Sequence, residues 1–456
     1  MTLTCFKSYD IRGRLGAELN EAVAALIGRA FGQTLSARRV VLGRDCRASS
    51  QALAGAVAVG LQEAGVQVLD LGLCGTEEVY FATAHLGADG GIVVTASHNP
   101  MDYNGMKLVK SGSAPLEPAI LAAVKSLAES AAFTPAAPGH VTPVDTRTAY
   151  VERVLSFVDI ASLRPLKILV NAGNGTAGPT FDALAAALAA RGAPLTFERL
   201  YHTPDGSFPN GIPNPLLPEN QPMTANAVRA HGADFAVAWD GDFDRCFLFD
   251  HVGAFVPGEY VVGLLAEAFL AKEPGATIIH DPRVVWNTQA MVARAGGQAL
   301  MAQTGHAFLK ARMRETGAVY GGEMSAHHYF RDFMACDSGM IPWLLVAELL
   351  SRRGQSLRDV LAARRAEFPS SGEINFRVAD VKSTVARIEA AYAPLAQLRN
   401  DLDGLSLDFT DWRLNLRASN TEPLLRLNVE SRGLPDLVQA KVAELSALIG
   451  GTNADH

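Results

Sequence analysis

The amino-acid sequence predicts an α/β protein with three α/β domains and a smaller C-terminal α+β domain. Its 456 residues suffice for about three domains of average size. Through the first three quarters of the chain, short apolar runs alternate with helix-length amphipathic segments, which is typical of parallel or mixed sheets covered by helices. In the last quarter the strand-like runs are joined by short turns, which favours an antiparallel sheet.

The first round of alternation begins with an amphipathic helix at 18–37 and a strand at 40–45. Ser49 or Ser50 can cap a second helix that runs to about Gly65. Two strands, a helix and a linker rich in Ala and Pro are then expected at 67–72, 90–96, 118–130 and 131–143.

The pattern then restarts twice. The second round has a strand at 167–170, a helix at 178–191 and a strand at 234–239. Between them, residues 202–222 contain six prolines, which predicts a stiff loop without regular structure. The third round is expected as a helix at 261–272, a strand at 277–281 and helices at 285–296 and 338–352.

The C-terminal segment completes the predicted organisation. Its strands are expected at 372–378, 405–409, 412–417 and 424–430, with one helix near 381–398 and another at the end. The predicted domains are 1–145, 146–239, 240–368 and 369–456.

Composition and charge exclude several classes of protein. Hydrophobic residues make up 48% of the chain and charged residues 19%, which rules out a disordered or fibrous protein. The net charge of −7 does not indicate nucleic acid or an anionic membrane as a partner. No apolar run is long enough to span a bilayer, and the first residues lack a secretory signal core. The five cysteines are scattered without a C-x-x-C pair, which fits a reducing cytoplasm.

A polar loop, TASHNP, follows the strand predicted at 90–96. It places Ser97 just beyond an apolar run, where α/β proteins usually build their sites. The loop lacks the G-x-S-x-G pattern of a hydrolase nucleophile, and by itself it is also compatible with an ordinary turn. Lys107 and Arg12 would be cations available to a phosphorylated serine if folding brings them near.

Three carboxylates, Asp240, Asp242 and Asp244, are crowded into the motif DGDFDR between two hydrophobic runs. Hard oxygen ligands at this density suit Mg²⁺. An EF-hand would require Gly at the sixth position and Glu at the twelfth, where Arg245 and His251 stand. Like charges at a strand end repel unless a cation lies among them, so a metal site is favoured over a solvated acidic turn.

The motif GEMSAHHYF alternates Glu323, Ser325 and His327. In an extended loop these three side chains would point the same way, and their alternating acceptors and donors suit sugar hydroxyls. An ordinary polar loop is an equally open interpretation of this motif.

The motif RASNTEP lies within the hairpin predicted at 412–430. It and the strand after it supply the donors Arg417, Ser419, Asn420, Thr421 and Arg426. Such a turn indicates a phosphate clamp, although a plain hairpin turn is about equally compatible with it.

One motif indicates a different function. The segment NAGNGTAG has Gly173, Gly175 and Gly178 in the spacing G-x-G-x-x-G, and Glu198 follows twenty residues later. This is the spacing of a dinucleotide fingerprint, so an NAD(P)-dependent oxidoreductase is the alternative. That alternative leaves the other loops without a role, and a glycine-rich turn can also serve close packing.

Together, these loops resemble the α-D-phosphohexomutase superfamily over essentially the whole chain. TASHNP, DGDFDR, GEMSAHHYF and RASNTEP occur in that family's order and at comparable spacing. The segments YDIRG (9–13), GRDCR (43–47), DYNGMK (102–107) and TGHAFLK (304–310) add to the match. Within the superfamily the sequence is most similar to the phosphomannomutase branch, including bifunctional phosphomannomutase/phosphoglucomutase enzymes. The resemblance implies four domains around a central cleft, each giving one loop.

The resemblance also implies a role for each loop. Ser97 would be the phosphoserine that donates and recovers phosphate. One of its phosphate oxygens would bind Mg²⁺ together with Asp240, Asp242 and Asp244. Lys107 and His327 are the expected acid/base groups. The other cationic or proton-transferring positions are Arg12, His98, Arg245 and His306.

The remaining expected residues bind substrate. Those for the sugar are Glu323, Ser325, His327 and Arg283. Those for the phosphate that is not reacting are Tyr9, Arg417, Ser419, Asn420, Thr421 and Arg426. In this superfamily the loop at 171–178 is structural, which makes the oxidoreductase a remote alternative.

The implied reaction interconverts mannose 6-phosphate and mannose 1-phosphate through a phosphoserine enzyme, with a hexose 1,6-bisphosphate as intermediate and activator. Action on glucose phosphates is expected as well, and phosphoglucomutase or phosphoglucosamine mutase is the alternative main activity. The expected partners are small sugar phosphates, with no nucleic acid and no membrane. A cytoplasmic monomer or weak dimer that supplies GDP-mannose or surface polysaccharide is what the family implies.

Overall fold

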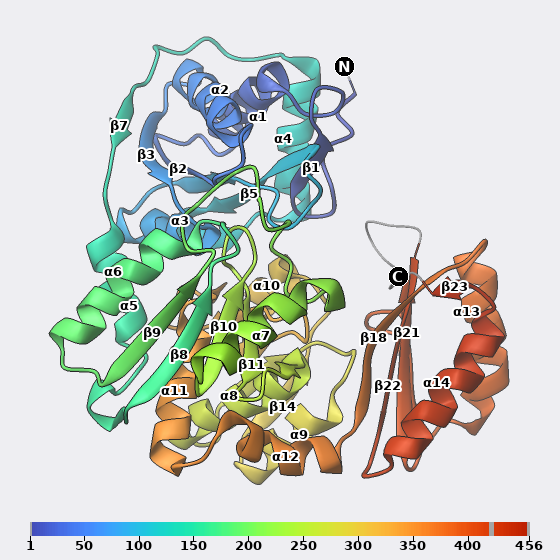
Figure 1. Cartoon of the computed structure of the whole chain (residues 1–456). Helices are drawn as coiled ribbons and strands as arrows, with labels where there is room; N and C mark the ends of the chain where they lie inside the picture. Colours follow the sequence, from blue (N-terminus) through green and yellow to red (C-terminus); the bar gives the residue numbers. More distant parts are fainter. Residues whose placement is uncertain (1, 419–423, 454–456) are drawn as a thin grey trace. The chain divides into compact units, whose positions relative to one another are not determined.

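The computed structural model describes residues 2–418 and 424–453 (Figure 1). The chain forms two compact units, each assembled from two stretches of sequence. Unit 1 comprises Met1–Phe255 and His327–Gly354, and unit 2 comprises Val256–Ala326 and Gln355–His456. The chain leaves unit 1 within β12 (Phe255–Val256).

The first sheet of unit 1 has the strand order β1-β5-β4-β2-β3-β7, with β6 beside β5. In this order the bounds are Ile11–Arg14, Tyr103–Lys110, Gly90–Val94, Arg39–Arg44, Gln67–Leu73 and Val141–Pro143, and β6 is Ala114–Pro115. Strands β4, β2, β3 and β7 are parallel to one another. Strand β5 pairs antiparallel with β4, and β1 pairs antiparallel with β5. Arg44 at the end of β2 pairs with Val94 at the end of β4, so the loops after these strands leave the sheet side by side.

Helices cover both faces of this sheet. They are α1 (Glu21–Thr34), α2 (Ser50–Glu63), α3 (Thr76–His85) and α4 (Pro118–Ser130). Helix α1 packs against α2 and α4, and Val40 and Leu42 of β2 belong to the same apolar core. Val41 of β2 and Val93 of β4 belong to a second core with α3. Burial on both faces explains why these strands are continuous apolar runs in the sequence.

The second sheet of unit 1 has the order β11-β10-β8-β9, with β12 at the β11 edge. Its parallel strands are β8 (Leu166–Asn171), β9 (Leu195–Leu200) and β10 (Phe235–Trp239), and β11 (Cys246–Asp250) returns antiparallel to β10. The other elements are α5 (Arg147–Leu155), α6 (Ala177–Ala190), α7 (Gln221–His231), the hairpin of β16 (His328–Phe330) and β17 (Cys336–Asp337), and α11 (Ile341–Arg353). Trp343 of α11 packs against Phe181 of α6, which also contacts Trp239 of β10.

Unit 2 begins with another α/β layer. Strand β13 (Thr277–His280) lies parallel between β14 (Gln298–Met301) and β15 (Tyr320–Gly322). The helices of this part are α8 (Gly258–Lys272), α9 (Trp286–Arg294), α10 (His306–Thr316) and α12 (Leu357–Glu367).

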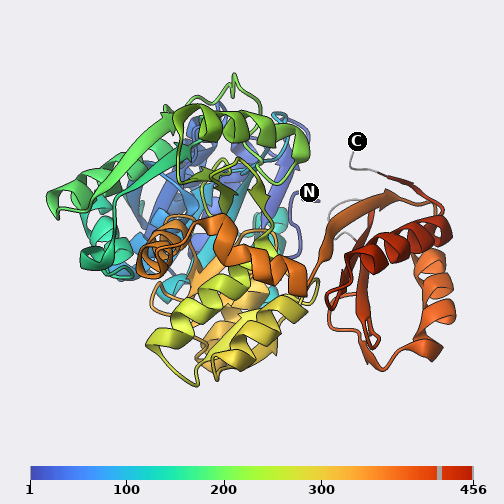
Figure 2. The same ribbon diagram turned by 60° about the horizontal axis from the view of Figure 1, so that its bottom comes forward.

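The C-terminal part of unit 2 is the expected α+β domain. Its antiparallel sheet has the order β19-β20-β21-β22-β18-β23. In this order the bounds are Leu398–Asn400, Leu405–Asp408, Trp412–Ala418, Leu424–Ser431, Ser370–Arg377 and Thr452–Asn453. Helices α13 (Val381–Tyr392) and α14 (Pro435–Ile449) lie on one face of the sheet (Figure 2). The prediction of an antiparallel sheet in the last quarter of the chain is therefore confirmed.

Some local predictions were wrong. The segment expected as a linker contains β7, which pairs in parallel with β3. The proline-rich segment is not wholly irregular, because Pro218–Asn220 is a 3₁₀ turn and α7 begins at Gln221. No helix was predicted between the strands at 67–72 and 90–96, where α3 lies. Residues 76–83 of α3 are all buried, and a helix buried on every side gives no periodic pattern of apolar and polar residues.

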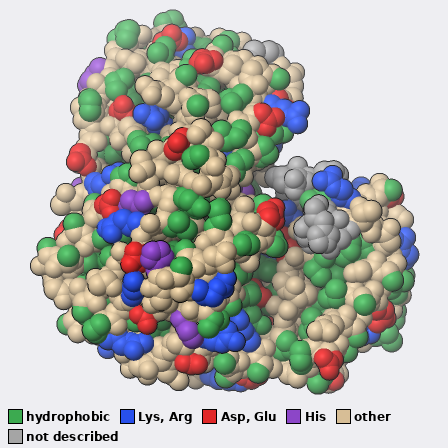
Figure 3. Space-filling view, viewed as in Figure 1, with side chains coloured by type: hydrophobic (Ala, Val, Ile, Leu, Met, Phe, Trp, Pro, Cys, Tyr) green, Lys and Arg blue, Asp and Glu red, His purple; other side chains and the backbone are tan. Residues whose placement is uncertain are grey.

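The surface is mixed in character. In Figure 3, hydrophobic side chains lie in patches among charged and polar groups. The exposed large apolar side chains come from separate parts of the chain and include Val59, Met101, Val252 and Leu395. Among the described residues, no helix combines the length and the apolar character that crossing a bilayer would require.

Two glycines of α2 should respond oppositely to alanine. A Cβ at Gly60 would lie 1.9 Å from the Ala25 carbonyl oxygen of α1, so Gly60→Ala must push the two helices apart. We expect a loss of at least about 2 kcal/mol in the free energy of unfolding. A Cβ at Gly55 would meet nothing within 4 Å, so Gly55→Ala should add up to about 1 kcal/mol. Urea unfolding measures both, and equal effects would contradict the described packing.

Candidate active site

Ser97 lies in the loop after β4, and its side chain is held in a defined direction. The residue is 3% exposed and its φ is 48°, in the left-handed region that residues other than Gly rarely adopt. Its Oγ donates to Asp240 Oδ2 at 2.5 Å and lies 2.9 Å from His98 Nδ1. Its backbone N–H donates to Thr95 Oγ1. The serine hydroxyl therefore points at the acidic loop.

The acidic loop joins β10 to β11, whose end residues Trp239 and Cys246 pair directly. Its three aspartates are at most 1% exposed, and one oxygen of each lies within 4.8 Å of the others: Asp240, Asp242 and Asp244. A Cβ at Gly241 would lie 2.6 Å from the Ser97 carbonyl oxygen. The backbones of the serine loop and the acidic loop are thus in direct contact.

This arrangement fits a hard divalent cation. Burial, together with the charges of Asp244 and Asp242, raises the pKa of Asp240 to about 8. Asp240 Oδ1 and Asp242 Oδ1 are buried and accept no hydrogen bond from the described residues. Carboxylate oxygens in such a position are the ligands that Mg²⁺ prefers, and a cation would return the carboxyl to its ionised form.

Lys107 reaches the same carboxylates from β5. Its Nζ lies 2.7 Å from Asp242 Oδ2 and also pairs with Asp244. Burial disfavours its charge, but the neighbouring aspartates outweigh that effect and raise the pKa of Lys107. The group is therefore a protonated ammonium beside the acidic loop, suited to neutralising charge or donating a proton.

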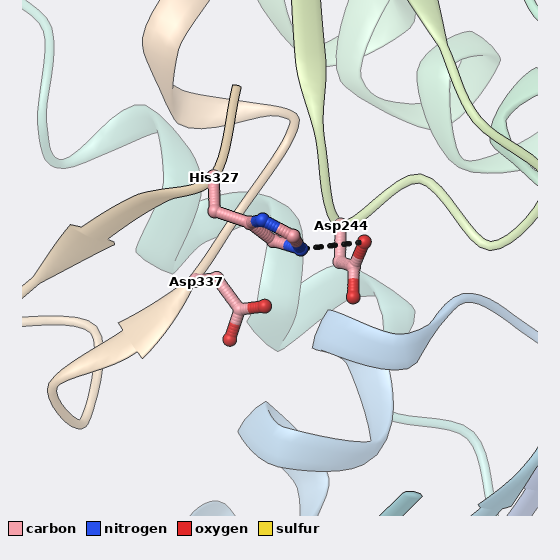
Figure 4. Close-up of side chains that lie close together, drawn as sticks. All are labelled: Asp244, His327 and Asp337. Atoms are coloured by element: carbon pink, nitrogen blue, oxygen red, sulfur yellow. Dashed lines mark ion pairs between the residues drawn. The ribbon is translucent and has the colours of Figure 1, made fainter. Parts of the chain in front are cut away.

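Arg245 is the last residue of the acidic loop, and His327 lies beside that loop. Arg245 Nε lies 3.5 Å from Asp240 Oδ2, and His327 Nε2 lies 3.7 Å from Asp244 Oδ1. A β-bridge between Arg245 and His327 brings their backbones together. Asp337, at the end of β17, is fully buried and completes a cluster with His327 and Asp244 (Figure 4).

His98 and Arg12 lie close to the serine. Burial, and then the charges of Arg245 and Arg12, hold the pKa of His98 well below its usual value, so its ring is neutral. Arg12, on β1, donates to the Thr95 carbonyl oxygen at 3.3 Å. Tyr9 precedes this strand and is half-buried.

Helix α3 supports the acidic loop through Thr76. The Thr76 hydroxyl donates to Asp242 Oδ2 at 2.5 Å, and its backbone N–H donates to the Asp242 carbonyl oxygen at 3.1 Å. A Cβ at Gly75 would lie 2.1 Å from the ring of Phe243. The N-terminus of α3 is thus fitted to the loop, and its positive dipole end favours the carboxylates.

The glycine-rich loop at 171–178 is filled by protein. Thr176 N–H donates to the Gly241 carbonyl oxygen at 3.0 Å, and a Cβ at Gly175 would lie 2.7 Å from that oxygen. A Cβ at Gly178 would lie 1.9 Å from the His202 carbonyl oxygen. Backbone carbonyl groups of neighbouring segments therefore lie directly against the glycines at the start of α6. The glycines serve close packing, and the oxidoreductase alternative has no site here.

In unit 2, Arg283 organises the expected sugar-binding residues. Its Nη2 lies 3.2 Å from Ser325 Oγ and 3.9 Å from Glu323, and it pairs with Asp281. Glu323 accepts from the Gly305 N–H at 2.9 Å, next to His306 at the start of α10. Glu323, Ser325 and Arg283 are therefore brought together, whereas the fourth expected sugar-binding residue, His327, belongs to unit 1 and lies beside Asp244.

The extended loop assumed for GEMSAHHYF is not found. Ala326 has a φ of 69° and donates its N–H to the Glu323 carbonyl oxygen, so the backbone turns there. The alternation of Glu323, Ser325 and His327 therefore does not place them on one side of a strand. The sequence pattern could not reveal this turn because Ala rarely adopts a positive φ.

Arg417 and Arg426 face each other across the hairpin of β21 and β22. Both reach Glu373 of β18, at 3.0 Å from Arg417 Nη2 and 3.3 Å from Arg426 Nη1, and Arg283 Nη1 lies 3.4 Å away. Burial opposes ionisation of Glu373, but the three arginines outweigh it and lower its pKa to about 2. The expected phosphate ligands Ser419, Asn420 and Thr421 lie outside the described residues.

Sequence reasoning missed four residues of these clusters. Thr76, Asp337, Glu373 and Arg47, which bonds the serine loop, all lie far in sequence from the groups they contact. The segment GRDCR was noted as a motif, but nothing in the spacing of the others marked them.

Removing the hydroxyl that supports Asp242 should weaken cation binding. We expect Thr76→Val to reduce Mn²⁺ affinity about 10-fold, because a ligand that loses its supporting hydrogen bond is less well oriented. Thr83→Val is the matched control, since Thr83 is also buried in α3 but its hydroxyl donates to the Val79 carbonyl oxygen of its own helix. Titration followed by electron paramagnetic resonance measures both. Equal affinities in the two variants would contradict the role of Thr76.

The buried His328 should make stability depend on pH. Burial lowers its pKa from 6.5 to about 3. Below pH 6.5 the unfolded chain therefore binds the proton and the folded chain does not, so stability falls as the pH falls. We expect a contribution of up to about 1.4 kcal/mol per pH unit, measured by urea unfolding between pH 6.5 and 4.5. His328→Gln should show a shallower decline, and identical slopes would contradict this prediction.

Comparison with known proteins agrees with this geometry. Four domain models of the family "Phosphoglucomutase/phosphomannomutase" match this chain in order. Alpha/beta/alpha domains I, II and III match residues 4–135, 148–253 and 257–368, and the C-terminal domain matches residues 373–447. A phosphomannomutase of Salmonella montevideo is 59% identical over 451 residues, covering 98% of this chain and 99% of the relative.

Two further relatives are similar over their whole length. The "phosphohexose mutases" protein of Xanthomonas campestris (strain ATCC 33913) is 55% identical over 455 residues, 99% of this chain and all of that protein. The crystal structure of a phosphoglucomutase/phosphomannomutase family protein from Burkholderia thailandensis has a TM-score of 0.88 at 34% identity, covering 99% of this chain and all of that one. With its four domains matched in order, the chain belongs to the phosphoglucomutase/phosphomannomutase family of phosphohexomutases.

Proposed function

We propose that this protein interconverts mannose 6-phosphate and mannose 1-phosphate through a phosphoserine at position 97. The observation that carries the proposal is the hydrogen bond from Ser97 Oγ to Asp240 within a buried acidic cluster. A relative named phosphomannomutase that is 59% identical supports mannose as the sugar.

The proposed first step moves the phosphoryl group from Ser97 to the free hydroxyl of the sugar phosphate. The bond between phosphorus and Ser97 Oγ breaks, a bond to the sugar oxygen forms, and the hydroxyl proton passes to a base. The product is a hexose 1,6-bisphosphate. After this intermediate turns over, its other phosphoryl group returns to Ser97 and an acid supplies the proton.

The residues around Ser97 are suited to these proton and charge movements. His327 Nε2, bordered by Asp244, is our candidate for the base. Lys107, protonated beside the aspartates, is the candidate acid and neutralises charge on the transferred group together with Arg245. Mg²⁺ held by Asp240, Asp242 and Asp244 would offset negative charge on the phosphoryl oxygens. His98 and Arg12 would orient the serine and its phosphate.

The residues of unit 2 would hold the rest of the substrate. Glu323, Ser325 and Arg283 would meet the sugar hydroxyls, with His306 beside them. The phosphate that is not reacting would bind Arg417, Arg426 and the loop that contains Ser419, Asn420 and Thr421, with Tyr9 also in contact. A charged anchor of this kind tolerates both orientations of the sugar, because it grips the phosphate rather than the ring.

Glucose phosphates are a second proposed substrate, because the name of the matched family includes phosphoglucomutase and one relative is named for hexose phosphates in general. Phosphoglucosamine mutase is a further alternative. A cytoplasmic monomer or weak dimer, activated by hexose 1,6-bisphosphate, completes the proposal.

Replacing the nucleophile tests the reaction. Ser97→Ala should lose nearly all turnover, at least about 1,000-fold, because no acceptor for the phosphoryl group remains. Sugar phosphate should still bind, as measured by calorimetry. Ser130→Ala, which changes an exposed serine at the end of α4, is the control.

The assay compares mannose 1-phosphate with glucose 1-phosphate, each with Mg²⁺ and catalytic bisphosphate. Full activity of Ser97→Ala would refute the mechanism, and turnover of glucose 1-phosphate alone would refute the assignment to mannose.

A further inference from the structure

Arg47 is the feature of unit 1 that the reaction leaves unexplained. It lies after β2, is only 3% exposed, and directs its guanidinium at the backbone of the serine loop. Nη2 donates to the carbonyl oxygens of Ser97 at 2.9 Å and Asn99 at 2.5 Å. Nη1 donates to those of Pro100 at 3.0 Å and Tyr103 at 3.4 Å. One side chain thus binds three carbonyl groups of the serine loop and a fourth at the start of β5.

The guanidinium is itself fixed from two sides. Asp45 Oδ2 lies 3.8 Å from Arg47 Nε and accepts the Ala96 N–H at 3.3 Å, while Asp45 Oδ1 accepts the Arg47 N–H. The ring of Phe208 lies 5.5 Å from the guanidinium carbon. Arg47 therefore has a carboxylate and an aromatic ring beside it and the loop in front.

Phe208 belongs to the proline-rich segment, residues 202–222. A Cβ at Gly206 would lie 2.0 Å from the Cys46 carbonyl oxygen, so this segment is seated directly on the chain next to Arg47. Asn174 of the glycine-rich loop donates to the Thr203 carbonyl oxygen at 2.9 Å. A segment stiffened by six prolines loses little entropy in holding this position.

The serine loop needs such a restraint. Ser97 has a φ of 48°, and a non-glycine residue persists there only when its surroundings over-determine the backbone. That conformation sets the direction in which Oγ points to Asp240. A planar guanidinium with donors in a fixed fork can bind several carbonyl groups at once, whereas a lysine ammonium cannot match this geometry.

We propose that Arg47, supported by Asp45 and Phe208, is a positioning residue that holds the Ser97 loop in its phosphoryl-transfer geometry. This inference rests on the proposed function. Arg47 acts through the loop backbone and not on the substrate, whose phosphate anchor is supplied by unit 2. Its loss should therefore lower the rate of phosphoryl transfer and leave the KM for the sugar phosphate nearly unchanged.

The central test is Arg47→Lys in the full chain. We expect kcat per mole of phosphoserine to fall about 100-fold, the effect of a displacement of about 1 Å at a reacting group, with KM within about 3-fold of the parent. Arg29→Lys is the matched control, because Arg29 also lies over a phenylalanine ring, at 4.6 Å, and pairs with Glu63 on the surface. It should keep the parent's kcat.

Chemical rescue separates positioning from a purely structural role. In Arg47→Ala, millimolar guanidinium should restore part of kcat, whereas equal concentrations of ammonium should not. A fall in activity explained wholly by less folded protein, with normal kcat per phosphoserine, would overturn the inference. So would Arg47→Lys with the parent's kcat, or absence of any rescue in a folded Arg47→Ala protein.

The parent protein keeps the two proposals apart. If the parent protein carries no phosphoserine and shows no mutase activity, the proposed function is refuted by the parent alone, whatever the Arg47 variants do. If the parent is active and Arg47→Lys matches it, the proposed function stands and the positioning role of Arg47 is refuted.

Discussion

Three carboxylates held within 4.8 Å of one another in a buried site repel strongly, and this repulsion governs the rest of unit 1. The surroundings offset it with the Lys107 ammonium, the Arg245 guanidinium, the Thr76 hydroxyl and the start of α3. A divalent cation would complete the compensation. The Ser97 hydroxyl, which we propose receives the phosphoryl group, hydrogen-bonds to the same cluster and so already lies where positive charge is required.

Close backbone contact makes this concentration of charge possible. The serine loop and the glycine-rich loop both meet the acidic loop at Gly241, where a side chain would collide with the Ser97 carbonyl oxygen. The glycine pattern that suggested a dinucleotide site is thus explained by packing. Within each sheet, neighbouring parallel strands end together. Strands β2 and β4 therefore place the Arg47 and Ser97 loops side by side, and β8 and β10 do the same for the glycine-rich and acidic loops.

In unit 2 the charges that repel are positive, because three arginines lie around one carboxylate. Arg283, Arg417 and Arg426 would repel one another without Glu373, whose carboxylate contacts all three. Guanidinium groups gathered in this way suit a phosphate dianion, which offers more charge and more acceptors than a carboxylate. The two units therefore divide the proposed work, with phosphoryl transfer at the acidic loop and substrate anchoring at the arginines.

The sequence by itself determined the class of fold, the order of the four motifs and the identity of the residues with reactive or charged groups. Ser97 and the three aspartates could be identified because each lies in a short, contiguous polar motif that follows an apolar run. Tertiary structure alone decided that Lys107, Thr76 and Asp337 join them, that residues 323–326 turn, and that Arg47 grips the serine loop. These contacts join residues distant in sequence, so no local pattern of hydrophobicity or propensity carries them, and only the packing of strands and helices brings them within hydrogen-bonding distance.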